Sequence, residues 1–165
     1  MYLNSIRSKE LVFTDKNDIK YNSYQKGKMN IICELPKLKI PFGIENNYNK
    51  YELKFELDDT CKYLKPLIRK IEEEVSKKLG MDMNECLRSN IREKDKYKDL
   101  LTVKVPHYRN KFSSKINSKN ENIYLPTFHD IAPNTYASST IHIKKLWNID
   151  NKFGLLIELK SLTIL

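Results

Sequence analysis

The chain has 165 residues, a hydrophobic content of 40% and a formal net charge of +9 at pH 7. A chain of this length can bury a core as one domain, and its hydrophobic content excludes a wholly disordered protein. No apolar run approaches the roughly 18 residues that cross a membrane, and the N-terminal MYLNSIRSKE lacks the apolar core of a signal peptide. We therefore expect one domain over residues 1–165 in an intracellular, cytoplasmic protein without a membrane partner.

The three cysteines, Cys33, Cys61 and Cys86, are odd in number, far apart and without a CxxC pair. This spacing argues against a disulfide framework and against a structural zinc site. We predict reduced, packed thiols.

The first part of the chain predicts short strands. Residues 1–28 contain one short apolar cluster at 11–13, which indicates a short strand beside a mobile loop. Residues 29–45 are apolar but contain Pro36 and Pro41. Because proline cannot donate to a β-ladder, two short strands or one bent strand are expected there.

Residues 51–57 alternate regularly between apolar and charged side chains. Tyr51, Leu53, Phe55 and Leu57 occupy the odd positions, and Glu52, Lys54 and Glu56 the even ones. A period of two predicts a strand with one buried face.

Residues 62–80 predict the one long helix. Its apolar stripe recurs at three- and four-residue spacing, at Leu64, Ile68, Ile71, Val75 and Leu79. Residues 58–60 offer an N-terminal cap, and Gly80 is placed to end the helix. Pro66 either occupies the first helical turn or kinks an earlier start.

Residues 88–119 hold most of the positive charge. Ten basic residues against three acidic ones give this stretch +7 of the net +9. Tyr97, Tyr108 and Phe112 lie among the cations, and an alternating segment at 101–105 predicts a strand that presents Lys104. A phosphate chain with flat bases needs positive charge and aromatic faces, so this stretch predicts a single-stranded nucleic-acid site. The alternative is a solvated, Lys-rich surface loop.

Residues 139–165 predict a closing β-hairpin. Ile141 and Ile143 alternate with polar residues, and an apolar run at 155–159 follows the turn-rich segment Asn148 to Gly154. The chain as a whole predicts a mainly β fold, a small closed or nearly closed β-barrel with one long capping α-helix and long polar loops. Barrel closure is expected because it removes the edges of so many short strands.

Two segments resemble a known family. The final hairpin STIHIKKLWNIDNKFGLLIELKSLTIL and the segment CLRSNIREKDKYKDLLTVKVPHYRNKFSSKI are similar to parts of OB-fold single-stranded DNA-binding proteins of replication. The likeness is to those of large nucleocytoplasmic DNA viruses and, more distantly, of short-tailed phages. It covers about residues 51–165.

The resemblance implies a five-stranded OB-fold barrel that coats and protects single-stranded DNA during replication and recombination, largely independently of sequence. Bases would stack on aromatic side chains, and lysines and arginines would contact phosphates. Carried over to this chain, the likeness supports Lys104, Arg109, Lys111, Phe112 and Trp147. The resembled phage proteins end in an acidic tail that recruits partners, whereas this sequence ends on Ile164 and Leu165, so recruitment by that route is not expected.

The candidate nucleic-acid-binding residues are Arg88, Arg92, Lys94, Lys96, Tyr97, Lys98, Lys104, Tyr108, Arg109, Lys111, Phe112, Lys115, Lys144 and Trp147. For Trp147, a core position is as consistent with the sequence as a stacking position. For Tyr108 and Phe112, which lie in a polar loop, stacking is favoured.

Single-stranded DNA is the expected partner, with replication proteins and a second copy of the chain as further candidates. The sequence has no phosphate-binding glycine loop, nucleophile elbow or HExxH motif, so neither an enzyme, nor a metal site, nor a cofactor is expected. Two alternatives stay open, a structural or scaffold protein of a virus particle and a general binder of polyanions such as duplex DNA or RNA.

Overall fold

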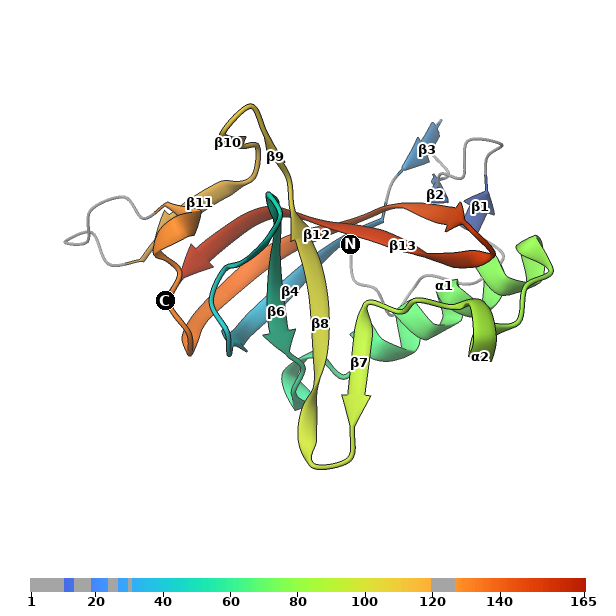
Figure 1. Cartoon of the computed structure of the whole chain (residues 1–165), viewed down its shortest axis with the longest axis horizontal. Helices are drawn as coiled ribbons and strands as arrows, with labels where there is room; N and C mark the ends of the chain where they lie inside the picture. The colour runs from blue at the N-terminus through green and yellow to red at the C-terminus, as the bar shows by residue number, and fades with distance from the viewer. Residues whose placement is uncertain (1–10, 14–18, 24–26, 30, 120–126) are drawn as a thin grey trace.

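The computed structural model describes residues 11–13, 19–23, 27–29, 31–119 and 127–165. The fold is mainly β and OB-like, built around one strongly bent sheet in the order β4-β12-β13-β8-β6-β5 (Figure 1). β7 adds to β8, and β11 adds to β13. The strands of this sheet are β4 (Ile31–Ile40), β5 (Glu45–Asn47), β6 (Lys50–Glu56), β7 (Ile91–Lys94), β8 (Tyr97–Val105), β11 (Lys115–Ser118), β12 (Thr135–Ile149) and β13 (Lys152–Ile164).

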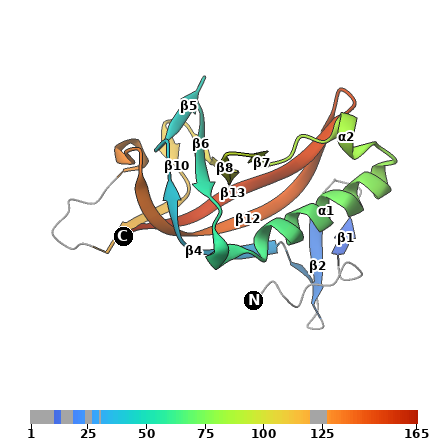
Figure 2. The same ribbon diagram turned by 90° about the horizontal axis from the view of Figure 1, so that it is seen from below.

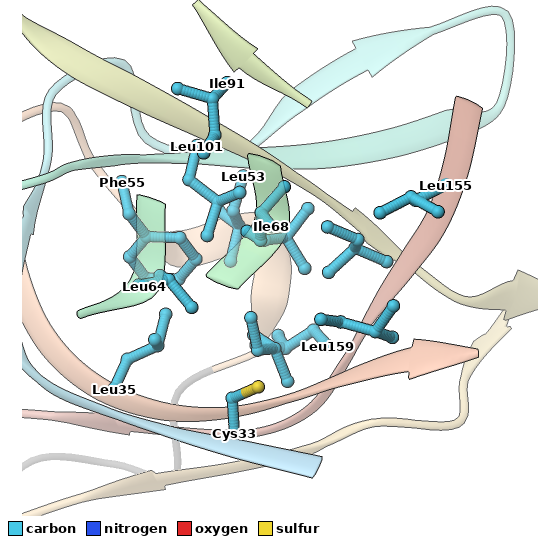
Figure 3. Packing of buried hydrophobic residues seen from close by; sticks show 14 of the residues in the cluster. Cys33, Leu35, Leu53, Phe55, Leu64, Ile68, Ile91, Leu101, Leu155 and Leu159 are labelled. Carbon is cyan, nitrogen blue, oxygen red and sulfur yellow. The ribbon is translucent and has the colours of Figure 1, made fainter. Parts of the chain in front are cut away.

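The expected closure of the barrel is wrong. Within the described ranges, no ladder joins β4 to β5 or to β6, so the sheet stays open. The helix α1 (Leu64–Leu79) lies against the concave side of the sheet instead (Figure 2). Its buried Leu64 and Ile68 face the buried side chains of β4, β6, β8 and β13, as Figure 3 shows. The helix therefore covers the apolar surface that a closing strand would otherwise cover.

Pro66 lies near the start of α1, and Gly80 lies at its end. Pro66 is the third residue of the helix, in the first turn, where its missing N–H costs no helical hydrogen bond. Gly80 ends the helix in the left-handed conformation with φ of 63°. The expected cap at 58–60 is wrong for this helix, because Asp58 instead caps the 3-10 turn η3 (Asp59–Cys61) by accepting from the Thr60 backbone N–H at 2.9 Å.

The apolar segment that begins at residue 31 forms one bent strand. Along β4 and β12 the register shifts so that Pro36 and Lys37 together face Ser138. This bulge places the proline where no ladder hydrogen bond is needed. It also supplies the bend that the sequence suggested.

The N-terminal region contains a separate small sheet in the order β1-β2-β3, formed by β1 (Leu11–Phe13), β2 (Ile19–Ser23) and β3 (Gly27–Met29). A single short strand was expected over residues 1–28. The mobile loop expected there falls on residues outside those described.

β12 and β13 form a long antiparallel hairpin. Its turn is tighter than expected, since only Asp150 and Asn151 lie between the strands, both with positive φ. Gly154 does not bulge but pairs with Trp147, and a Cβ there would lie 2.8 Å from the indole ring. The glycine therefore makes room for the tryptophan.

The three cysteines are buried free thiols. Burial raises the pKa of Cys33 to about 12. Among the described helices, none has the length and apolar content needed to cross a membrane.

Candidate nucleic-acid interface

In the β7–β8 hairpin, the charged residues of the basic stretch lie on two opposite sides of the sheet. Ile91 and Leu101 point into the core, so the alternate residues Arg92 and Leu100 point to the other side of the sheet. We call this side, which is turned away from α1, the outer face. Its residues on these strands and on β6 include Lys54, Glu56, Arg92, Lys94, Lys98 and Leu100.

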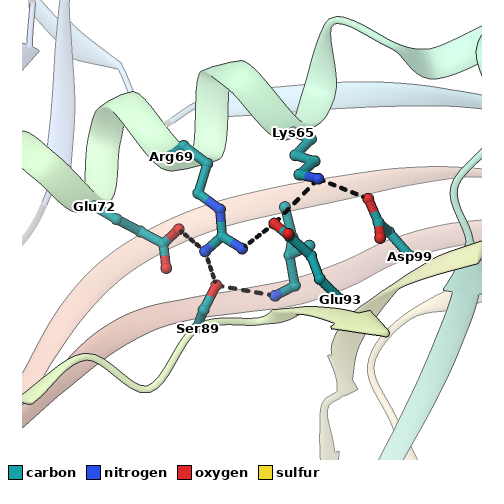
Figure 4. Close-up of polar contacts among 7 residues, drawn as sticks. Lys65, Arg69, Glu72, Ser89, Glu93 and Asp99 are labelled. Atoms are coloured by element: carbon teal, nitrogen blue, oxygen red, sulfur yellow. Dashed lines mark hydrogen bonds and ion pairs between the residues drawn. The ribbon is translucent and has the colours of Figure 1, made fainter. Parts of the chain in front are cut away.

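Two of the three acidic residues in the basic stretch, residues 88–119, form ion pairs with cations of α1. The Glu93 carboxylate lies 2.7 Å from Arg69 Nη2 and 3.1 Å from Lys65 Nζ, and Asp99 lies 2.8 Å from the same lysine (Figure 4). Hydrogen bonds from Arg69 and Lys65 lower the pKa of Glu93. On the outer face, Lys54 is itself paired with the Glu45 carboxylate, 2.8 Å from its Nζ, so Arg92, Lys94 and Lys98 carry the excess of positive charge.

A buried carboxylate fixes Arg69 in this position. Glu72 is 1% exposed, and its Oε1 lies 3.1 Å from Arg69 Nη1. The same Nη1 donates to Ser89 Oγ at 2.9 Å, and this hydroxyl oxygen also accepts from the Ile91 backbone N–H. Burial raises the pKa of Glu72. Helix α1 is thus tied to the start of β7 through one guanidinium.

The outer face contains a groove of about 410 Å³. Two exposed aromatic side chains take part in its lining, Phe42 at 52% exposure and Tyr97 at 73%. Lys54, Arg92, Lys94, Lys98 and the Glu56 carboxylate also line the groove, together with Pro41 and Leu100. Aromatic rings beside clustered cations are the side chains that hold a single nucleic-acid strand.

Phe42 is the functional candidate that the sequence analysis missed. It lies between Pro41 and Gly43 in the connection from β4 to β5, and Lys54 Nζ is 5.7 Å from its ring centroid. Gly43 has φ of 66°, and a Cβ there would clash with the Ile131 carbonyl oxygen. The sequence did contain a signal for Phe42, namely a large aromatic residue between a proline and a glycine.

The hairpin of β9 (His107–Tyr108) and β10 (Lys111–Phe112) separates its two aromatic residues. Tyr108 is 73% exposed, with the Arg109 guanidinium 5.2 Å from its ring centroid. Phe112 turns inward against Tyr51 and Phe128, at centroid distances of 4.9 and 5.0 Å. Stacking on bases was favoured for both residues, but Phe112 packs against the core and anchors the hairpin.

Lys104 and Lys144 lie where positive charge is balanced. In the sheet Lys104 stands between Glu52 of β6 and Glu158 of β13. Lys144 Nζ lies 3.5 Å from the Glu158 carboxylate. These two lysines contribute less net positive field than the exposed lysines of the β7–β8 hairpin.

The remaining candidates are dispersed. Trp147 is half-buried, and its ring lies over Gly154 at the end of the β12–β13 hairpin. Arg88 is exposed beside it, after α2 (Met83–Cys86). Lys115 and Lys111 are exposed on β11 and β10, and Lys96 lies in the β7–β8 turn. The structure therefore gathers Arg92, Lys94, Lys96, Tyr97 and Lys98 in the β7–β8 hairpin. A second group, Tyr108, Arg109, Lys111 and Phe112, lies in the β9–β10 hairpin, and the other candidates lie outside both hairpins.

No group of three or more His, Cys, Asp or Glu side chains that could hold a metal ion occurs in the described part of the chain.

No protein-family model matches the sequence, and no curated protein matches it. Solved structures do match. The single-stranded DNA-binding protein from bacteriophage Enc34 superposes with a TM-score of 0.56 at 14% identity, over 93% of this chain and 88% of the phage chain. A C-terminal truncation of that protein gives 0.52 at 13% identity, over 95% of this chain and 94% of its own.

A second phage protein shows the same likeness. The single-stranded DNA-binding protein gp2.5 of bacteriophage T7 gives a TM-score of 0.53 at 8% identity, over 82% of this chain and 86% of its own. At these identities the similarity is one of fold. It confirms the expected likeness to the phage proteins at that level, and the likeness to proteins of large nucleocytoplasmic DNA viruses stays a prediction.

Proposed function

We propose that this protein binds single-stranded DNA along its outer face. The observation that carries the proposal is the groove in which Phe42 and Tyr97 lie beside Arg92, Lys94 and Lys98, while Glu93 and Asp99 are bound to α1. The fold supports it, because the phage proteins with this fold are single-stranded DNA-binding proteins by name.

Each group in the interface has a physical role. Phosphates contact Arg92, Lys94 and Lys98, and bases stack on Phe42 and Tyr97. β8 has nine residues and spans roughly 26 Å, so it can lead a strand from this groove toward Tyr108. Aromatic stacking and phosphate contacts tolerate every base, so binding is largely independent of sequence.

The biological role that fits this binding is to coat and protect single strands in replication and recombination, without catalysis and without a cofactor. Replication proteins and a second copy of the chain are the partners we propose beside the DNA itself.

The test is a titration of labelled oligo-dT of about 30 bases, and of a duplex of equal length, at about 50 and 200 mM salt. We expect tighter binding to the single strand, weakened by salt as counterion release requires. Lys94→Ala should lower the affinity and reduce the salt slope by about 0.7. Lys70→Ala is the matched control, because Lys70 is exposed on α1, away from the outer face.

The alternatives give different results. Equal affinity for the duplex, with equal effects of the two lysine substitutions, would show a general polyanion binder. A lack of binding to both nucleic acids would refute the proposal and favour the scaffold interpretation.

A further inference from the structure

The groove carries a carboxylate, Glu56, among its cations. Such a group repels phosphate, so a purely electrostatic DNA site would not need it. We propose that Glu56 reads the edge of one base and makes this subsite prefer bases with an exocyclic amino group over thymine. The inference rests on the proposed binding of single-stranded DNA.

The sheet register places Glu56 beside an apolar floor. Leu100 of β8 pairs with Glu56 of β6 on one side and with Arg92 of β7 on the other. With strands about 4.8 Å apart, the backbones of Glu56 and Arg92 stand roughly 10 Å apart with Leu100 between them. A flat base fits over the leucine, with the carboxylate at one edge and the guanidinium at the other.

The Glu56 carboxylate keeps acceptor capacity for a ligand. Its described ion pair is with Lys39 Nζ, at 3.9 Å from Oε1, and its side chain is 22% exposed. An ionised carboxylate accepts at about four lone-pair sites and donates at none. A contact at 3.9 Å is too long for a hydrogen bond and so leaves these sites available.

Base chemistry then sets the preference. Cytosine offers its N4 amino group, which carboxylates accept from, whereas thymine carries the O4 acceptor at the same position. A carboxylate facing O4 meets repulsion in place of a hydrogen bond. Comparing cytosine with thymine isolates this contact, because both are pyrimidines that stack on aromatic rings.

The experiment measures the affinity of the full chain for oligo-dC and oligo-dT of equal length at slightly alkaline pH. We expect oligo-dC to bind about fivefold more tightly, the effect of one hydrogen bond of ordinary net strength. Glu56→Gln should bring the two affinities together, because an amide can also donate to O4. Thermal unfolding of each variant checks that it is folded.

Glu52→Gln is the matched control. Glu52 lies on the same strand and the same side of the sheet, pairs with Lys104 and does not line the groove. Both substitutions remove one negative charge, so both raise the affinity for any polyanion, but only Glu56→Gln should change the dC/dT ratio.

Three results would overturn the inference. Equal affinity of the wild-type chain for both oligomers, or an unchanged ratio in Glu56→Gln, would refute the reading of the base while leaving single-strand binding intact. Binding to neither oligomer would refute the proposed function and the inference with it.

Discussion

The Arg69 guanidinium on α1 holds the Glu93 carboxylate on β7 at 2.7 Å while its other terminal nitrogen, Nη1, lies 3.1 Å from the buried Glu72. One side chain thus neutralises a buried acid and turns a second acid away from the outer face. Stability and surface charge depend on the same residue.

Removing Arg69 should therefore destabilise the fold. Arg69→Ala leaves the Glu72 carboxylate buried without its partner, which costs about 3 kcal/mol in the free energy of unfolding measured by urea denaturation. The double variant Arg69→Met with Glu72→Gln should recover most of this loss. Lys70→Ala, on the exposed side of α1, should change stability by less than about 0.5 kcal/mol. Equal losses in the two single variants would contradict this role of Arg69.

Acid should weaken the attachment of β7 to α1. Hydrogen bonds from Arg69 and Lys65 lower the folded-state pKa of Glu93 below its ordinary value of 4.5. A lowered pKa contributes stability that is present above pH 4.5 and is lost as the pH falls toward the folded-state value. Thermal midpoints measured between about pH 3 and 7 should fall on the acid side, and Glu93→Gln should flatten that fall.

Glu72 should act in the opposite direction. Burial raises its folded-state pKa above the ordinary 4.5, so its protonation favours folding as the pH falls from neutral toward 4.5. Glu72→Gln should therefore remove a rise in stability on mild acidification, measured in the same series of midpoints. A steeper rise in the variant would be inconsistent with this sign.

Phe42 should contribute to single-strand affinity. Phe42→Ala removes a stacking surface worth about 1 to 3 kcal/mol per base, so affinity for oligo-dT should fall fivefold or more. Tyr48→Ala is the control, because Tyr48 is fully exposed in the nearby turn between β5 and β6 and does not line the groove. Similar losses in both variants would show that the groove is not the stacking site.

Substitution of Phe112 should affect mainly the stability of the fold, and substitution of Tyr108 mainly the binding of DNA. Phe112→Ala opens the aromatic cluster around Tyr51 and Phe128 and should lower the free energy of unfolding by about 2 to 3 kcal/mol. Tyr108→Ala should leave unfolding nearly unchanged and weaken oligo-dT binding, because its ring is exposed. The opposite assignment would mean that Phe112 faces the DNA.

Local pattern determined much of what the sequence analysis predicted. The alternation at 51–57 and 101–105, the stripe of α1 and the left-handed Gly80 all depend on neighbours within a few residues. The cluster of positive charge at 88–119 is likewise a property of the sequence, as are its interleaved aromatic residues.

Tertiary structure alone decided how these charges and rings are used. Glu93 meets Arg69 across 24 positions of sequence, and Phe42 lines the same groove as Tyr97 across 55. Phe112 and Tyr108 have similar sequence surroundings, yet one packs inward and the other faces solvent. Side-chain periodicity says which residues share a face of one strand, but which strands become neighbours depends on the packing of the whole core. The partners of a charge or an aromatic ring are therefore set only when the sheet and α1 come together.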